Sequence, residues 1–291
     1  MNLWRMHLRT GIGDISSFCF DKRIVGLGWP VDSEPVSKDA YLIAYRQKYG
    51  SRKKGAVEAF ASDINEKEDL LWVRKGMTYF LGKVGAWKCG DSQEIATRGI
   101  GSVRPYDWAE IGPEDCVPGS VVTNFIKGPA FRRIGNKHAL EYSRYIFAKA
   151  MKHDIPTSRV DQEGILDLIG PEDLEDVVAI YLQLVEGCVL FPSTFKKGTK
   201  GVEGYGVSRS DLTLIGWQVK TGKDTIDEDK FATIKGKVFL LQLEKWPDTP
   251  TKPPCIRLRP DDIRNFLLDP NHKQLMPKKI QTWIDYVQAG G

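Results

Sequence analysis

The sequence has few cysteines and histidines, and they are scattered along the chain. The five cysteines include no Cys-x-x-Cys pair, and the four histidines are equally dispersed. A disulfide framework uses an even set of cysteines, and a structural zinc site uses closely spaced Cys and His pairs. We therefore expect neither a disulfide framework nor a zinc site.

Long apolar runs are also missing. No stretch approaches the roughly 18 consecutive apolar residues that suggest a membrane-spanning helix. The first residues, MNLWRMHLRTGIGD, lack the apolar core of a secretory signal. Repeats and low-complexity tracts are absent as well. We expect a globular protein of the cytoplasm that has no membrane partner.

Two domains are expected from the length of 291 residues. Residues 1–150 hold 23 basic and 17 acidic side chains, a net charge of +6, whereas the remainder holds 19 and 21, a net charge of −2. A basic half beside an acidic half suits a domain that faces nucleic acid and a domain whose carboxylates hold a metal. Pro156, in a polar segment, favours a boundary near residue 155, which gives domains 1–155 and 156–291.

The first half is predicted to be rich in short strands. The pattern indicates helices at residues 36–62 and 137–152. It indicates strands at residues 3–8, 18–20, 23–29, 70–73, 78–84, 101–103 and 120–125. Short strands with frequent turn signals predict a small β-barrel-like domain with one inserted helix.

The second half mixes helices and strands. Residues 165–182 are expected to contain a helix, and Pro171, followed by Glu172 and Asp173, is a strong helix start within them. A last helix carries Ile280, Trp283, Ile284 and Val287, which predict either core packing or a dimer face. The order predicts an α/β sandwich, so the chain combines the α+β and α/β classes. The expected strands are residues 188–191, 201–207, 211–220 and 237–242, and the expected terminal helices are 260–268 and 277–288.

Three side chains in the second half suggest phosphodiester hydrolysis. Gln218 and Lys220 are two residues apart on a predicted strand, so they share one face. Glu203 lies in a segment that suits the neighbouring strand. A carboxylate and an amide oxygen can hold a hard divalent cation, and a lysine can stabilise charge on a phosphate.

These residues resemble the PD-(D/E)xK nuclease superfamily. The matching parts are Pro171-Glu-Asp-Leu-Glu175, Glu203 and Gln218-Val-Lys220-Thr-Gly222, and the closest subgroup is the Mrr-like restriction endonucleases, which have glutamine in the E-x-K position. The resemblance covers about residues 165–245. It implies a restriction-endonuclease sandwich, Mg²⁺ or Mn²⁺ as cofactor, Glu175 as the helix glutamate, and Glu203 with Gln218 as metal ligands. Glu203 replaces the usual aspartate, and Asp211 is the alternative.

The first half is weakly similar to PUA-like domains, including the EVE type, through Gly26-Leu-Gly-Trp29 and the strands that hold Trp72 and Tyr79. This resemblance implies a reader of modified bases. A base taken out of the stack can be held between aromatic rings. The predicted nucleic-acid contacts are Trp29, Trp72, Tyr79, Arg74, Lys75, Lys196 and Lys197.

Together, the two halves predict a modification-dependent DNA restriction endonuclease that acts in defence against foreign DNA as a homodimer. Three alternatives remain open. The protein could cut RNA, because PUA-like folds also bind RNA. It could be a nucleic-acid-binding module whose nuclease site has degenerated. The first half could also be a protein-interaction domain within a larger defence complex.

Overall fold

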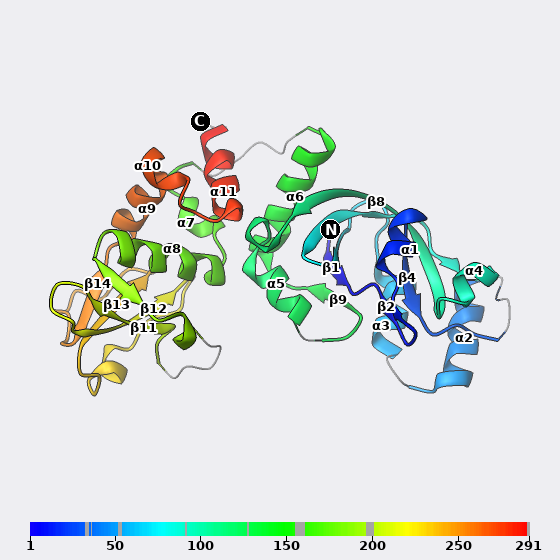
Figure 1. The fold of residues 1–291 in the computed structure, drawn as a ribbon, viewed down its shortest axis with the longest axis horizontal. Coiled ribbons are helices and arrows are strands. Elements are labelled where there is room, and N and C mark those ends of the chain that lie inside the picture. Colours follow the sequence, from blue (N-terminus) through cyan, green and yellow to red (C-terminus); the bar gives the residue numbers. More distant parts are fainter. Residues whose placement is uncertain are drawn as a thin grey trace. The chain divides into compact units, whose positions relative to one another are not determined.

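The computed structural model describes residues 1–32, 35, 37–51, 54–90, 92–126, 128–154, 161–195 and 201–289. The chain has a mixed α and β fold that divides into two compact units, residues 1–156 and 157–291 (Figure 1). Residues 155–160, which contain the predicted boundary, lie outside the described residues. Each unit has its own β-sheet. Over the described residues, no helix has the length and apolar character to cross a bilayer.

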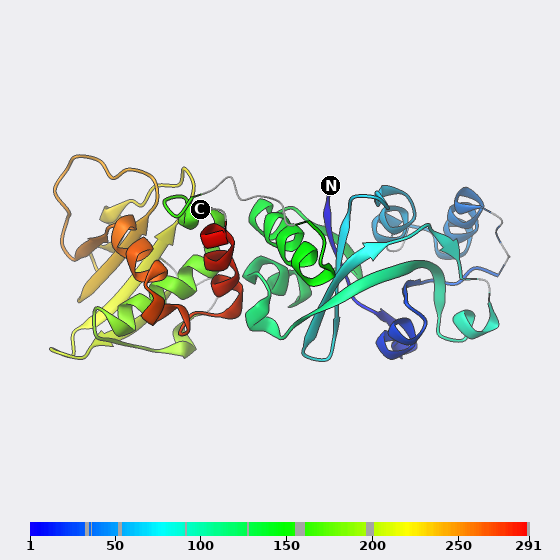
Figure 2. The same cartoon turned by 90° about the horizontal axis from the view of Figure 1, so that it is seen from above.

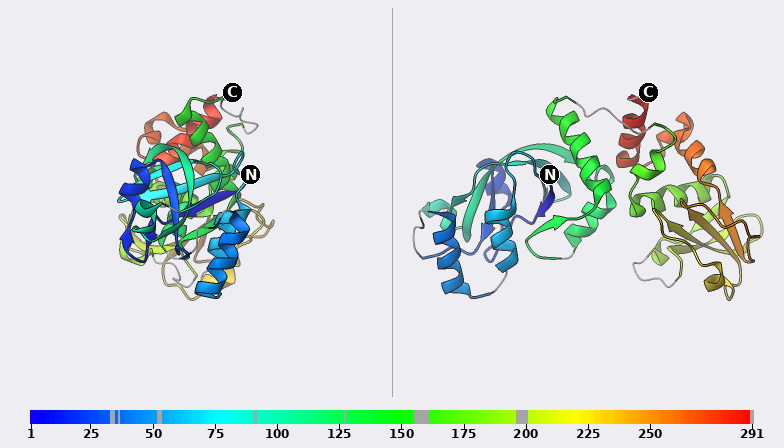
Figure 3. Two further views of the ribbon diagram at one scale, coloured as in Figure 1. Left: turned by 90° about the vertical axis from the view of Figure 1, so that its right-hand side faces the viewer. Right: turned by 180° about the vertical axis from the view of Figure 1, so that it is seen from behind.

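The first unit is built on a curled sheet with the strand order β4-β8-β6-β5-β1-β9, and β7 also pairs with β8 (Figure 3). Among the described strands of this sheet, only the neighbours β1 and β5 run parallel. β2 (Arg9–Thr10) and β3 (Gly13–Asp14) form a separate small pair. The strands of the main sheet are β1 (Leu3–Met6), β4 (Ile24–Gly28), β5 (Leu70–Lys75), β6 (Thr78–Val84), β7 (Lys88–Cys89), β8 (Ile100–Gly112) and β9 (Phe131–Ile134).

The predicted barrel is only half realised, because the sheet curls without closing. β4 and β9 end the strand order, and among the described residues they do not pair with each other. The hairpin predicted at residues 70–84 is confirmed: β5 and β6 pair antiparallel, with Lys75 opposite Thr78. Strand β9 has no counterpart in the sequence prediction.

Helices surround this sheet. Asn136 begins α6, and its side chain accepts a hydrogen bond from the Ala139 amide. Ser37 caps α2 in the same way through the Ala40 amide. The helices of the first unit are α1 (Ser16–Asp21), α2 (Lys38–Tyr49), α3 (Lys54–Glu58), a π-helical turn (Ala59–Asp63), α4 (Gln93–Ala96), a 3₁₀ turn (Glu114–Cys116), α5 (Gly119–Ile126) and α6 (Lys137–Met151).

Two segments predicted as strands are helical instead. Residues 18–20 belong to α1, and residues 120–125 belong to α5. The β-branched residues of the second segment favoured a strand. However, Val117, Val121 and Phe125 recur every four residues and pack into one core cluster, which is the spacing of a helix face.

The second unit holds a five-stranded mixed sheet with the order β10-β11-β12-β13-β14. The first three strands are antiparallel, and the last three are parallel. Strand β14 lies outside every segment predicted from the sequence. The strands are β10 (Cys188–Leu190), β11 (Gly204–Ser208), β12 (Leu214–Lys220), β13 (Lys237–Gln242) and β14 (Cys255–Leu258).

Helices α8, α9 and α11 lie on one face of this sheet (Figure 2). All four apolar side chains of the last helix, from Ile280 to Val287, are buried, so they serve core packing. Lys279 adds an ion pair to Asp173 at 2.8 Å, which joins α11 to α8. The helices are α7 (Ile165–Leu168), α8 (Pro171–Leu184), α9 (Pro260–Leu268), α10 (Pro270–Lys273) and α11 (Lys278–Ala289), with 3₁₀ turns at Pro192–Thr194 and Glu228–Phe231.

Candidate functional site

Gln218 and Lys220 stand on one face of β12, close to its end. The parallel register with β13 places Leu240 beside Gln218 and Gln242 beside Lys220. Gln242 is fully buried, and its side-chain oxygen accepts a hydrogen bond from the Ile226 amide at 2.7 Å. This hydrogen bond holds the segment that follows β12 against the sheet next to Lys220.

Glu203 lies next to Gln218, one residue before the neighbouring strand β11. Its backbone amide donates to the Trp217 carbonyl at 2.8 Å, which continues the antiparallel pairing of β11 with β12 by one residue. The side-chain amide of Gln218 donates a hydrogen bond to the Glu203 carboxylate. Two residues of the predicted site, fifteen positions apart in the sequence, are therefore in direct contact.

Glu175, early in α8, completes an acidic cluster with Glu203. Burial first, and then the charges of Glu203 and Glu172, raise the pKa of Glu175 to about 7, while Lys220 opposes the rise. The pKa of Glu203 is also raised, because burial outweighs the opposing effects of Lys220 and Gln218. The helix thus brings a second carboxyl group into the electrostatic field of the strand residues.

Glu175, Glu203 and Gln218 are the residues that could hold a hard divalent cation. Within the described ranges, no three His, Cys, Asp or Glu side chains gather closely enough to hold a metal ion. Here two carboxylates, Glu175 and Glu203, would be joined by the amide oxygen of Gln218. Mg²⁺ keeps several of its waters and needs only one or two carboxylates from a protein. Its charge would also relieve the repulsion between the two glutamates.

Asp211, the alternative acid, does not join this cluster. It precedes the start of β12, whereas Lys220 ends that strand, so the two lie roughly 20 Å or more apart along the strand direction. Asp211 instead pairs with Lys237 at 2.8 Å. The predicted DNA contacts Lys196 and Lys197 lie outside the described residues. Glu203 is therefore the acid that meets Gln218.

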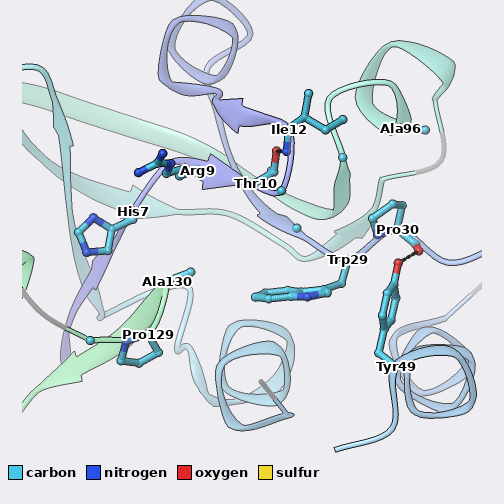
Figure 4. A pocket seen from close by; sticks show the side chains of 14 residues that line it. His7, Arg9, Thr10, Ile12, Trp29, Pro30, Tyr49, Ala96, Pro129 and Ala130 are labelled. Atoms are coloured by element: carbon cyan, nitrogen blue, oxygen red, sulfur yellow. Dashed lines mark hydrogen bonds between the residues drawn. The ribbon is translucent and has the colours of Figure 1, made fainter. Parts of the chain in front are cut away.

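A cavity of about 730 Å³ opens in the first unit. In Figure 4 the Trp29 ring lies between the side chains of His7 and Tyr49. The volume of the cavity falls within the range of about 300–1,000 Å³ that is typical of small-ligand sites. The wall comes from distant parts of the chain, namely His7, Arg9, Thr10, Gly11, Ile12, Gly28, Trp29, Pro30, Tyr49, Ala96, Gly99, Gly128, Pro129 and Ala130.

Trp29 has an unusual backbone conformation at this cavity. Its φ is +74°, which L-residues with bulky side chains rarely adopt. The Tyr41 hydroxyl donates to the Trp29 carbonyl at 3.1 Å, and the Tyr49 hydroxyl donates to the Pro30 carbonyl at 2.7 Å. Gly101 packs so closely on the Trp29 carbonyl that any side chain there would clash. Strain held in place by several contacts often marks a ligand site.

Trp72 and Tyr79 do not fit the predicted role as base contacts, which is a correction to the sequence analysis. Both rings are buried in the core beneath α5 and α6. The Trp72 indole donates to the Ser143 hydroxyl at 2.9 Å. A ring enclosed by its own core offers no face to a base. Of the three predicted aromatic contacts, Trp29 alone lines the cavity.

Arg74 and Lys75 are exposed at the tip of the β5–β6 hairpin. The Arg74 guanidinium lies 5.8 Å from the ring centres of both Tyr79 and Phe125, and the Lys75 ammonium lies 5.5 Å from that of Phe20. Both cations are accessible to a phosphate. Their role as DNA contacts stays a prediction.

Sequence reasoning missed the other residues that line the cavity. His7 and Arg9 follow β1, whereas Tyr49 ends α2, and only the folded chain brings them together. One signal was present: Tyr41, Tyr45 and Tyr49 recur every four residues. That spacing places three aromatic rings on one helix face.

Comparisons of the chain with models of protein families, with curated proteins and with solved structures found no significant match.

Proposed function

We propose that this protein is a metal-dependent DNA endonuclease that acts on modified DNA, in defence against foreign DNA. One observation carries the proposal: the side-chain amide of Gln218 donates a hydrogen bond to the Glu203 carboxylate. Lys220 follows two residues later on the same strand, and the charges of Glu203 and Lys220 both act on Glu175. This set of groups supplies oxygen ligands and one cation within a small region. Phosphodiester hydrolysis requires both.

Each side chain has a role in this proposal. Mg²⁺ held by Glu203 and the Gln218 carbonyl oxygen would act as a Lewis acid and lower the pKa of a bound water. Lys220 stabilises the negative charge that develops on the phosphate. Glu175 has a pKa of about 7 without metal, and a cation bound beside it would lower this pKa, so its carboxylate would support the metal from the helix side.

The cavity at Trp29 is the proposed site that reads the modified base. Aromatic rings stack on bases, and an extruded base needs a preformed pocket of this size. The Tyr41 and Tyr49 hydroxyls hold the backbone carbonyls of Trp29 and Pro30 at this cavity. A basic net charge over residues 1–150 favours attraction to DNA.

The first experiment is cleavage of DNA that carries modified bases beside the same sequence without modification, with Mg²⁺ or EDTA. Lys220→Ala should abolish cutting without loss of the folded state. Lys237→Ala is the matched control, because it removes a lysine from the opposite end of the same sheet. We expect the control to cut at the wild-type rate.

The outcomes separate the parts of the proposal. Cutting of modified DNA only, lost in Lys220→Ala, supports both parts. Equal cutting of both DNAs keeps the nuclease and rejects the reader. Cutting of RNA alone makes the protein an RNA-directed nuclease. Tight binding without cutting under any divalent metal rejects the enzyme in favour of a binding module.

The proposal includes a homodimer, because one active site cuts one strand. Sedimentation equilibrium with and without DNA tests this directly. A monomer that still makes double-strand breaks in single-turnover experiments would reject it.

A further inference from the structure

Several cations converge at the His7 end of the cavity. The His7 ring lies 5.3 Å from the Phe125 ring, and the guanidinium groups of Arg5 and Arg74 lie 5.9 Å and 5.8 Å from the same ring. Burial first, and then the charges of Arg5, Arg74 and Arg9, lower the pKa of His7 to about 4. One buried aromatic ring is thus surrounded by an imidazole and two guanidinium groups.

Asp14 is an acid that faces Arg9 across the β2–β3 pair and lies in its electrostatic field. In the part of the chain that the structure describes, no carboxylate forms an ion pair with Arg5, Arg9, Arg74 or Arg132. Arg132 faces Arg5 across the β1–β9 pair. The pKa of Arg5 is lowered to about 10, mainly by burial and secondly by the charge of Arg132. The cluster therefore carries an excess of positive charge, in which Arg5 is buried and Arg9, Arg74 and Arg132 are exposed.

Arg5 is the most unusual member of this group. Its side chain is fully buried, and its only hydrogen bond to the described residues runs from Nη1 to the Pro129 carbonyl at 2.5 Å. The Nε and Nη2 groups are buried without a partner. A buried charged group whose N–H groups lack acceptors is strongly unfavourable, so a negative charge bound close to Arg5 would offset part of this cost.

The unpaired side of Arg5 is separated from the cavity by backbone alone. Gly128 and Pro129 line the cavity, and a Cβ at position 128 would lie 2.6 Å from Arg5 Nη2. The φ of Gly128 is +129°, which also excludes an ordinary side chain. The glycine thus allows the cavity wall to pass directly over the guanidinium, while His7 and Arg9 line the same end.

We propose that this end of the cavity, formed by His7 and Arg9 and backed by Arg5, binds the phosphate of a nucleotide whose base stacks on Trp29. The inference depends on the proposed reading role of the cavity and extends it from a base to a whole nucleotide. A guanidinium group is well matched to a phosphate, because it presents several N–H donors in a planar fork. The ligand is therefore a nucleoside phosphate, either free or as part of a DNA strand.

The test is calorimetric titration of the full-length protein with inorganic phosphate, with the four deoxynucleoside 5′-monophosphates and with the matching nucleosides. We expect monophosphates to bind about tenfold or more tightly than nucleosides, the effect of one or two charged hydrogen bonds. Arg9→Ala and Arg5→Met should remove this difference. Arg23→Ala is the matched control, an exposed arginine of the same unit that pairs with Asp107 outside the cavity.

Arg9 is exposed, so its variant tests the site even if Arg5→Met does not fold. Equal binding of nucleosides and monophosphates by the wild type would overturn the proposal. So would the absence of binding for every phosphate probe, or an equal loss of affinity in the Arg23→Ala control.

Two further measurements separate this inference from the proposed function. Displacement of the monophosphate by a DNA strand identifies a strand phosphate as the ligand, whereas no displacement identifies a free nucleotide. If Arg9→Ala has no effect on nucleotide binding, the phosphate site is rejected. The reader is kept in that case if Trp29→Ala still loses the discrimination between modified and unmodified DNA. Failure of Lys220-dependent cleavage would reject the nuclease and leave the phosphate site intact.

Discussion

The side-chain amide of Gln218 donates a hydrogen bond to the carboxylate of Glu203 across two adjacent antiparallel strands. The contact joins a neutral donor to an acid whose pKa burial has already raised. Because the amide also carries a carbonyl oxygen, the same side chain can serve the carboxylate or a cation. This duality makes position 218 the most informative place to test the metal site.

Replacement of Gln218 should change the response to Mg²⁺. Gln218→Leu removes both the donor and the oxygen ligand, so we expect a loss of about 1–3 kcal/mol of stability at neutral pH and no stabilisation by Mg²⁺. Gln218→Glu adds a third acid to the cluster. We expect it to be less stable than wild type in EDTA and to gain more than wild type when Mg²⁺ is added, because a cation that binds only the native state stabilises it.

Thermal melts in EDTA and in a Mg²⁺ series measure these effects. A Mg²⁺-induced shift of equal size in wild type, Gln218→Leu and Gln218→Glu would show that Gln218 is not a metal ligand. Asp211→Asn is the control for a general effect of charge, since Asp211 pairs with Lys237 away from the cluster.

The raised pKa of Glu175 predicts how stability depends on pH without metal. The ordinary pKa is 4.5, and the native-state value is about 7. Between these values the native state binds more protons than the unfolded state, so stability falls as pH rises through this window. Glu175→Gln removes this contribution. As the pH rises from 4.5 to 8, the free energy of unfolding of the variant should increase by about 1–2 kcal/mol relative to that of wild type. This is less than the full pKa shift implies, because Glu175 is partly exposed.

Urea unfolding in EDTA at several pH values tests this prediction. Glu244→Gln serves as the control, because Glu244 is an exposed acid of the same unit whose charge is not one of the causes that raise the pKa of Glu175. If wild type and Glu175→Gln lose stability in parallel between pH 4.5 and pH 8, the pKa of Glu175 is not raised in the native state. With Mg²⁺ added at pH 8, we expect the gain of the variant to shrink, because the cation compensates the wild-type charge.

Trp29 should determine the affinity for modified DNA. Stacking of a base on an aromatic ring contributes roughly 1–3 kcal/mol, so Trp29→Ala should weaken binding by about tenfold or more, whereas Trp29→Phe should retain most of it. Fluorescence anisotropy with labelled modified and unmodified strands measures both affinities. If Trp29→Ala weakens the two strands equally, the residue contributes to general DNA binding and does not read the modification.

The contact between Glu203 and Gln218 in the second unit could be predicted because it depends on short-range rules. Alternation along β12 sets the shared face of Gln218 and Lys220, and a neighbouring antiparallel strand fifteen residues earlier suits Glu203. The cavity of the first unit could not be predicted. Its wall joins residues up to 123 positions apart, from His7 to Ala130, and no local pattern encodes such a meeting.

The error at Trp72 and Tyr79 has a physical reason. Along β5, Leu71 and Val73 enter one core cluster, whereas Leu70 and Trp72 enter the other. The sheet is thus covered on both faces, so alternation does not distinguish a buried ring from an exposed one. Sequence alone identified the aromatic residues, but only the packing of α5 and α6 shows which of them are enclosed.

Asp69 is predicted to hold the start of the first unit together. This buried carboxylate accepts hydrogen bonds from the Asn2 amide at 2.6 Å, from the Trp4 indole at 2.8 Å and from the Asn65 amide at 3.1 Å. Asp69→Ala would leave these donors without an acceptor near β1. We expect a loss of about 2–4 kcal/mol in the free energy of unfolding, because each unpaired buried donor is unfavourable.

Urea unfolding monitored by tryptophan fluorescence measures the effect of Asp69→Ala, with Asp107→Ala as the control. Asp107 is an acid of the same unit that is 65% exposed and pairs with Arg23 on the surface. Surface ion pairs contribute about 0–1 kcal/mol, so the control should change stability little. Equal effects of the two substitutions would show that the carboxylate does not stabilise β1 through its buried hydrogen bonds. Because β1 leads directly into His7 and Arg9, we also expect Asp69→Ala to weaken nucleotide binding at the cavity before the unit unfolds.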